Sequence, residues 1–145
     1  MGKNIRTIGK NAFYGCKKLN SVTIGKNVTK IGTGAFSGCK KLVTVKMGSK
    51  VSVIGDKAFY NCASLKSITL PKTVKKIGKN AFYGCGKLKK ITVKTRKLTL
   101  KNVGKDAFSG ISIRASVLVP EDKRKEYALL FRKRGAGKKI RIKTK

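Results

Sequence analysis

The chain repeats itself every 23 residues, and this period constrains its fold more than any other feature. The phrase Ile-Gly-x-x-Ala-Phe begins at Ile8 and recurs at Ile31, Ile54 and Ile77, and a variant copy begins at Val103. The four cysteines keep the same spacing, at Cys16, Cys39, Cys62 and Cys85. A unit of this length cannot bury its own apolar side, so neighbouring units must stack and bury their apolar residues as continuous ladders. The period therefore predicts a solenoid.

Each unit contains two recognisable pieces. The segment Leu19–Ile24 ends in an alternation of apolar and polar residues, which is typical of a short strand with one buried face. The segment Ala12–Cys16 spans one helical turn and places its apolar residues on one side. Gly9 and Gly15 allow sharp bends between these pieces. The pattern thus predicts one strand and one short helical turn per unit.

The string I-G-x-x-A-F-x-x-C-x-x-L-x-x-V-x-I resembles the leucine-rich repeats of the BspA-like (Treponema-type) class, over roughly residues 2–110. The resemblance implies an α/β architecture: a right-handed solenoid with a parallel β-sheet on the concave face and short helical turns on the convex face. Members of this class are mostly surface-exposed bacterial proteins, with some protozoan ones. They are associated with adhesion and host interaction rather than catalysis.

We divide the chain into a solenoid, residues 1–119, and a C-terminal cap, residues 120–145. The repeat units are 2–24, 25–47, 48–70, 71–93 and a degenerate unit at 94–119. In the cap, Pro120 suits the first position of a helix at about 121–134, which Gly135 ends. A basic edge strand is expected at about 138–143, where its charges oppose pairing with another sheet. A similar helix and basic strand close many surface proteins of this class in gut Gram-positive bacteria.

The chain begins in the middle of the pattern, because Met1 stands where Ile24 and Met47 end earlier strands. We expect this sequence to be the C-terminal piece of a longer cell-surface or secreted protein whose export signal lies upstream. The alternative is a natural start at which Met1 covers the end of the stack. No apolar run approaches the roughly 18 residues of a membrane-spanning helix.

The composition excludes most catalytic chemistry. The chain has no His, so Ser-His-Asp triads, Cys-His dyads and His-containing zinc sites are impossible. Five Asp and Glu leave little for a magnesium or calcium cage. The periodic cysteines predict a buried ladder of reduced thiols rather than disulfides, and a straight ladder does not converge on a zinc ion. We predict a protein that is not an enzyme and has no catalytic residue, cofactor or metal.

The net charge of +32, from 37 Lys and Arg, is the informative anomaly. Such a surface attracts polyanions at long range. The predicted concave strands turn Thr, Ser and Lys outward, a combination suited to an anionic polymer or glycan. The partner expected is an anionic cell-wall polymer, a host glycan or a host protein. The candidate ligand-binding residues on this face are Thr23, Lys46, Lys66, Thr69, Lys89, Lys90 and Thr92.

Two other functions fit the same composition. A basic chain binds nucleic acid non-specifically at low salt, but Lys outnumbers Arg 30 to 7, base-edge readout favours Arg, and no helix-turn-helix, RRM or KH pattern is present. A passive spacer that displays another domain has the same sequence signature. Tyr14, Tyr60 and Tyr83 recur beside lysines, where they either stack on bases or sugars or cover the turns.

Overall fold

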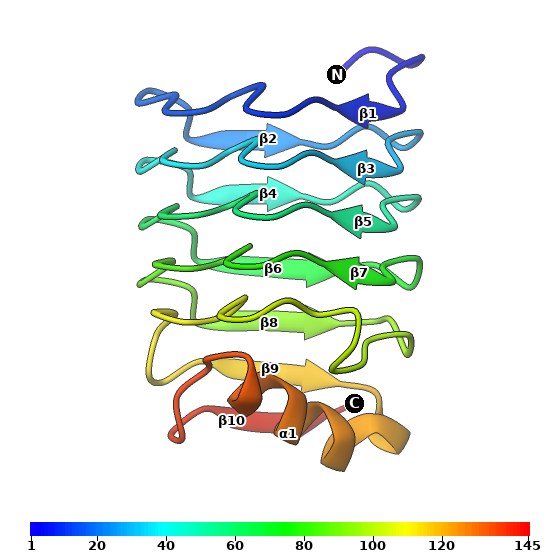
Figure 1. Cartoon of the computed structure of the whole chain (residues 1–145), viewed down its shortest axis with the longest axis vertical. Helices are drawn as coiled ribbons and strands as arrows, with labels where there is room; N and C mark the ends of the chain where they lie inside the picture. Colours follow the sequence, from blue (N-terminus) through cyan, green and yellow to red (C-terminus); the bar gives the residue numbers. More distant parts are fainter.

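The computed structural model describes residues 1–145 as a stack of coils with two parallel sheets (Figure 1). The larger sheet has six strands in the order β10-β9-β8-β6-β4-β2. They are β2 (Ser21–Thr23), β4 (Thr44–Lys46), β6 (Ser67–Leu70), β8 (Lys90–Val93), β9 (Ser116–Val119) and β10 (Arg141–Thr144). Residues 23 apart lie side by side, as Val22 does with Val45. The predicted solenoid with a parallel sheet is confirmed.

A second sheet, which the sequence analysis did not predict, runs along the other side of the stack. Its four strands, in spatial order, are β1 (Thr7–Ile8), β3 (Lys30–Ile31), β5 (Val53–Ile54) and β7 (Lys76–Ile77). Strands of two residues are too short to show an alternation of apolar and polar side chains. They form because the 23-residue register aligns their backbones on those of the neighbouring coils.

The helical turns expected on the convex face are absent, and that part of the prediction is wrong. The segment Ala12–Cys16 consists of consecutive turns instead. Asn11 and Gly15 have φ angles of 54° and 65°, which interrupt a right-handed helix. Their N–H groups donate to carbonyls of the next coil, so the turns are joined from coil to coil as the strands are.

The glycine of the Ile-Gly phrase serves close approach rather than bending in every coil after the first. A Cβ built on Gly55 would lie 2.8 Å from the backbone carbon of Gly32 in the preceding coil. Gly9 has no coil before it, its φ is not positive, and a Cβ there would meet nothing within 4 Å. Any side chain at Gly55 would therefore push two coils apart.

The interior is one cluster of 38 buried apolar residues, arranged as ladders along the stack. The phenylalanine rings stack in a column, with centroids 5.3 Å apart between Phe36 and Phe59 and again between Phe59 and Phe82. All four cysteines are free thiols, as the spacing predicted. The buried Cys62 thiol donates to the carbonyl of Phe36 at 3.1 Å, and burial raises the pKa of Cys85 to about 12. Burial of this kind lowers the reactivity of a thiol, and it applies to Cys39, Cys62 and Cys85, whereas Cys16 in the first coil is only half-buried.

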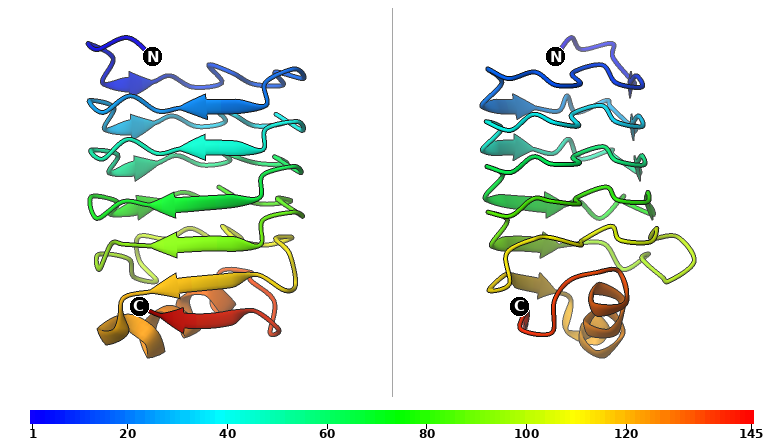
Figure 2. Two further views of the ribbon diagram at one scale, coloured as in Figure 1. Left: turned by 180° about the vertical axis from the view of Figure 1, so that it is seen from behind. Right: turned by 60° about the vertical axis from the view of Figure 1, so that its left-hand side comes forward.

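The cap consists of a 3₁₀ turn η1 (Glu121–Lys123), helix α1 (Arg124–Lys133) and strand β10 (Figure 2). Pro120 has an extended ψ of 140° and lies before the 3₁₀ turn, so it is not the first helical residue as expected. The strand expected at about 138–143 begins later, at Arg141, because Ile140 donates to Gly137 in a turn. The expected terminal helix and strand are both present.

Helix α1 closes the stack by continuing its ladders. The ring of Phe131 lies 4.3 Å from that of Phe108, at the end of the phenylalanine column. The buried Tyr127 hydroxyl donates to the carbonyl of Thr95 at 2.9 Å and accepts from the N–H of Leu98 at 3.3 Å. The helix has ten residues, and nothing in the structure forms a helix long and apolar enough to cross a membrane.

Candidate binding surface

The outward side of the six-stranded sheet, here called the strand face, carries aligned rows of polar side chains. The register places Thr23 beside Lys46, Ser67 beside Lys90, and Thr69 beside Thr92. Neighbouring strands in a sheet are about 4.8 Å apart, so each row is a closely spaced ladder. The inward residues between these rows, such as Ile68 and Ile91, are buried. The strand face therefore repeats Thr, Ser and Lys along the stack.

The seven predicted residues all lie on this sheet or at the start of its strands. Lys66 and Lys89 immediately precede β6 and β8, and both are exposed. Six of the seven are exposed, and Thr92 is half-buried. The stack is nearly straight, so the strand face is flat rather than deeply concave (Figure 2). That these residues bind a ligand stays a prediction.

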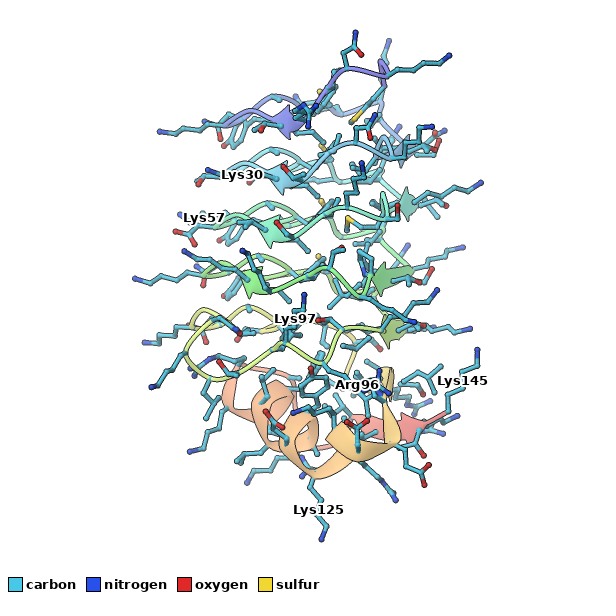
Figure 3. The ribbon with its side chains drawn as sticks, turned by 90° about the vertical axis from the view of Figure 1, so that its right-hand side faces the viewer. Lys30, Lys57, Arg96, Lys97, Lys125 and Lys145 are labelled. Carbon is cyan, nitrogen blue, oxygen red and sulfur yellow. The ribbon has the colours of Figure 1, made fainter.

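The strand face is hollowed at one end, where β8 and β9 finish. This depression, here called the basic hollow, has a volume of about 240 Å³. It is lined by Lys72, Thr92, Val93, Lys94, Arg96, Leu118, Val119, Pro120 and Lys145. Of the seven predicted residues, only Thr92 is among them. Figure 3 shows Arg96 above the first turn of the cap and Lys145 at the end of the chain on the same flank.

The repeat pattern did not predict the cations of the basic hollow, because these residues are not separated by the 23-residue period. Lys72 and Lys94 follow the carboxyl ends of β6 and β8, and Lys145 follows β10. Ligands of parallel sheets often bind at the carboxyl ends of the strands, and this rule is the signal that could have found them. Arg96 lies in a stretch that departs from the repeat, so no ladder position marks it.

Carboxylates do little to neutralise this surface. No Asp or Glu occurs before Asp56, whose side chain accepts from the backbone N–H of Lys79 at 2.8 Å. Only two ion pairs form: Lys123 with Glu126, and Arg96 with Asp122. With 37 Lys and Arg, the basic side chains therefore lie almost entirely unpaired, projecting from every level of the stack (Figure 3).

The tyrosine row on the turns is explained by packing. The rings of Tyr60 and Tyr83 stack with centroids 5.1 Å apart, and the Lys57 ammonium lies 5.7 Å from the centroid of Tyr60. Tyr14 is 66% exposed and forms no such stack, because Ser37 occupies the next position of the row. Two of the three rings thus cover the turns and one another, as the simpler interpretation expected.

The structure brings no three metal-binding side chains of His, Cys, Asp or Glu together. The cysteines lie one per coil rather than around one point: the thiols of Cys39, Cys62 and Cys85 each donate to a phenylalanine carbonyl of the preceding coil. The surface offers ammonium, guanidinium and hydroxyl donors, and such groups suit the binding of anions.

Comparison with known proteins supports this architecture. A family model described as a BspA type leucine rich repeat region matches residues 2–133 in six copies. The solved leucine rich repeat protein of T. pallidum is 32% identical, with a TM-score of 0.70, and the match covers 79% of this chain and 52% of that one. A leucine rich cell surface protein from Faecalibacterium prausnitzii is 27% identical, with a TM-score of 0.75, and the match covers 94% of this chain and 34% of that one.

The pneumococcal vaccine antigen PcpA shares the fold alone, at 20% identity and a TM-score of 0.74, over 99% of this chain and 40% of that one. No curated protein sequence matches this chain. The chain spans about half the length of the T. pallidum protein and about a third of the F. prausnitzii protein. Because the family model matches most of the sequence, with the ladders and turns described above, the chain belongs to the BspA-type leucine-rich repeat family.

Proposed function

We propose that this chain is a non-catalytic binding module of a bacterial cell-surface protein, and that its strand face binds anionic polymers or glycans. The observation that carries the proposal is the aligned Thr, Ser and Lys rows of an exposed sheet, in a chain with a net charge of +32. The F. prausnitzii relative, described as a cell surface protein, supports the location.

The electrostatics favour a long, flexible polyanion. Ladder positions repeat at the strand spacing, so one extended chain can contact several coils at once. Each contact with a cation releases a counterion, and the affinity therefore depends steeply on salt. Lysine dominates the cations of this surface, and its ammonium acts as a point charge without the planar fork of arginine. This composition suits attraction to a charged backbone better than the reading of base edges.

The test compares two triple variants of equal charge. The strand-face variant carries Lys66→Gln, Lys89→Gln and Lys90→Gln. The control variant carries Lys30→Gln, Lys75→Gln and Lys76→Gln, whose side chains are exposed at the smaller sheet. Teichoic acid, heparin and duplex DNA are titrated against each protein between 50 and 300 mM salt, with folding checked by circular dichroism.

We expect the strand-face variant to bind teichoic acid or heparin about tenfold more weakly, with the salt slope reduced by roughly two to three units. The control variant should lose much less affinity for the same polymers. Equal losses in the two variants would reduce the binding to unspecific attraction. Tighter binding of duplex DNA than of the other polymers would favour the nucleic-acid alternative.

The location is tested separately, by labelling intact cells of the source organism with an antibody against residues 2–145. We expect labelling without permeabilisation. Labelling that needs permeabilised cells contradicts a surface module, whatever the titrations show, because the fold by itself does not specify where the protein acts.

A further inference from the structure

We propose that the basic hollow binds one phosphate or sulfate ester group, held by the guanidinium of Arg96 together with Lys72, Lys94 and Thr92. This inference rests on the proposed function, since the ester belongs to the anionic polymer, and it assigns one specific site where the rest of the strand face offers repeated, equivalent contacts.

The shape of the basic hollow favours a small group. Its volume of about 240 Å³ lies below the roughly 300–1,000 Å³ of sites for drug-sized ligands. Leu118, Val119 and Pro120 line the hollow together with the cations, so part of its wall is apolar. An apolar wall keeps water away from part of a bound anion and strengthens the attraction of the nearby charges. The hollow therefore fits a charged group with part of its sugar or glycerol carrier.

Arg96 is oriented for such a ligand. Its Nε donates to both carboxylate oxygens of Asp122, at 3.2 Å and 3.3 Å, while its two terminal nitrogens donate to no group of the protein. The contact with Asp122 engages the guanidinium through its Nε and leaves the Nη hydrogens without a partner in the protein. A planar fork of this kind matches two oxygens of a phosphate or sulfate at once. Asp122 is thus a positioning residue.

The other polar groups approach from different strands. Lys72 and Lys94 follow β6 and β8, and both are exposed at the rim, while the half-buried Thr92 hydroxyl makes no hydrogen bond within the protein. Donors from several strands that line one hollow suit a tetrahedral anion, whose oxygens point in different directions. A carboxylate has only two oxygens, both in one plane, and cannot accept from all of these donors at once.

The probes are two short oligomers of matched charge: a glycerol phosphate oligomer for the phosphate ester and a sulfated heparin oligosaccharide for the sulfate ester. An oligogalacturonate of the same charge supplies the carboxylate comparison. Each is titrated calorimetrically into the full chain at 150 mM salt. A preference for the first or the second probe distinguishes a wall polymer from a sulfated glycan as the source.

The decisive variant is Arg96→Lys, which keeps the net charge and removes the fork. We expect it to weaken binding of the preferred oligomer about tenfold, and Arg96→Gln to weaken it further. The matched control is Arg114→Gln, an exposed arginine that does not line the hollow, and it should change the affinity less than about threefold. Arg96 is itself more than half exposed, so these variants should retain the fold, as the melting temperature will show.

Unchanged affinity of Arg96→Lys overturns the proposed site, because long-range attraction depends on charge alone. Equal binding of the oligogalacturonate also overturns it. In both cases polyanion binding by the strand face, and hence the proposed function, is untouched. Failure of the wild-type chain to bind any of the oligomers or the long polymers overturns the site and the proposed function together.

Discussion

Replacement of Phe59 by alanine tests whether the ladders stabilise the solenoid as the structure indicates. The Phe59 side chain is fully buried, and its ring stacks on two neighbours, each with its centroid at 5.3 Å. Phe13 occupies the equivalent place in the first coil, where it is half-buried and stacks on one neighbour at 5.1 Å. The two substitutions remove the same atoms, so their difference isolates burial and stacking.

The magnitude follows from these environments. Removing a fully buried phenylalanine ring costs about 3–5 kcal/mol, and each aromatic pair contributes about 0.5–1.5 kcal/mol beyond the area that it buries. We expect Phe59→Ala to lower the free energy of unfolding by about 4–5 kcal/mol. Phe13→Ala should cost about 1–2 kcal/mol, because its cavity opens to solvent and it loses only one stacked pair.

Urea unfolding followed by far-ultraviolet circular dichroism measures both values, at one fixed ionic strength because the net charge is so high. Wild type and both variants should retain the same spectrum before unfolding. Equal losses in the two variants would refute the reasoning, since they would mean that position within the column of rings does not determine stability.

Of four further predictions, one concerns the cap, two concern the thiols and one concerns the charge. Tyr127→Phe should lower the free energy of unfolding by about 1–3 kcal/mol in the same assay, because it leaves the buried Leu98 N–H and Thr95 carbonyl without their partner; an unchanged value would contradict this role. A thiol reagent at pH 8 should modify Cys16 alone in the folded chain, and more than one modified thiol would contradict the burial. Because the pKa of Cys85 is raised to about 12, its unfolded thiol ionises first, so the melting temperature should fall as pH rises above about 9. Added sodium chloride up to 0.5 M should raise the melting temperature by screening repulsion among the lysines, and a fall would show that this repulsion does not limit stability.

The 23-residue period by itself determines the architecture of the stack. Residues 23 apart occupy equivalent places in stacked coils, so Phe36, Phe59 and Phe82 had to form one column and the cysteines another. The same argument placed Thr23 beside Lys46 on the strand face. A repeated sequence specifies these contacts because the partner of each residue is its own counterpart in the next unit.

The conformation of the turns could not be predicted in this way. The segment Ala12–Cys16 has the composition of a helical turn, yet the positive φ at Asn11 and Gly15 and the hydrogen bonds to the next coil exclude a helix. A two-residue strand such as β1 is visible only when its neighbour is in place. Local sequence indicates the backbone conformation that an isolated segment prefers. Here the hydrogen bonds to the adjacent coil impose a different conformation.

Only the tertiary structure assembled the basic hollow. Lys72, Lys94, Arg96 and Lys145 share no repeat position, and they meet because strands β6, β8 and β10 end along one edge of the sheet. The sequence by itself determined the ladders, the strand face and the excess of positive charge. The position of the basic hollow depends on how the irregular fifth coil and the cap strand β10 pack at the end of the sheet. The sequence does not predict these contacts, because they join non-equivalent segments that follow no period.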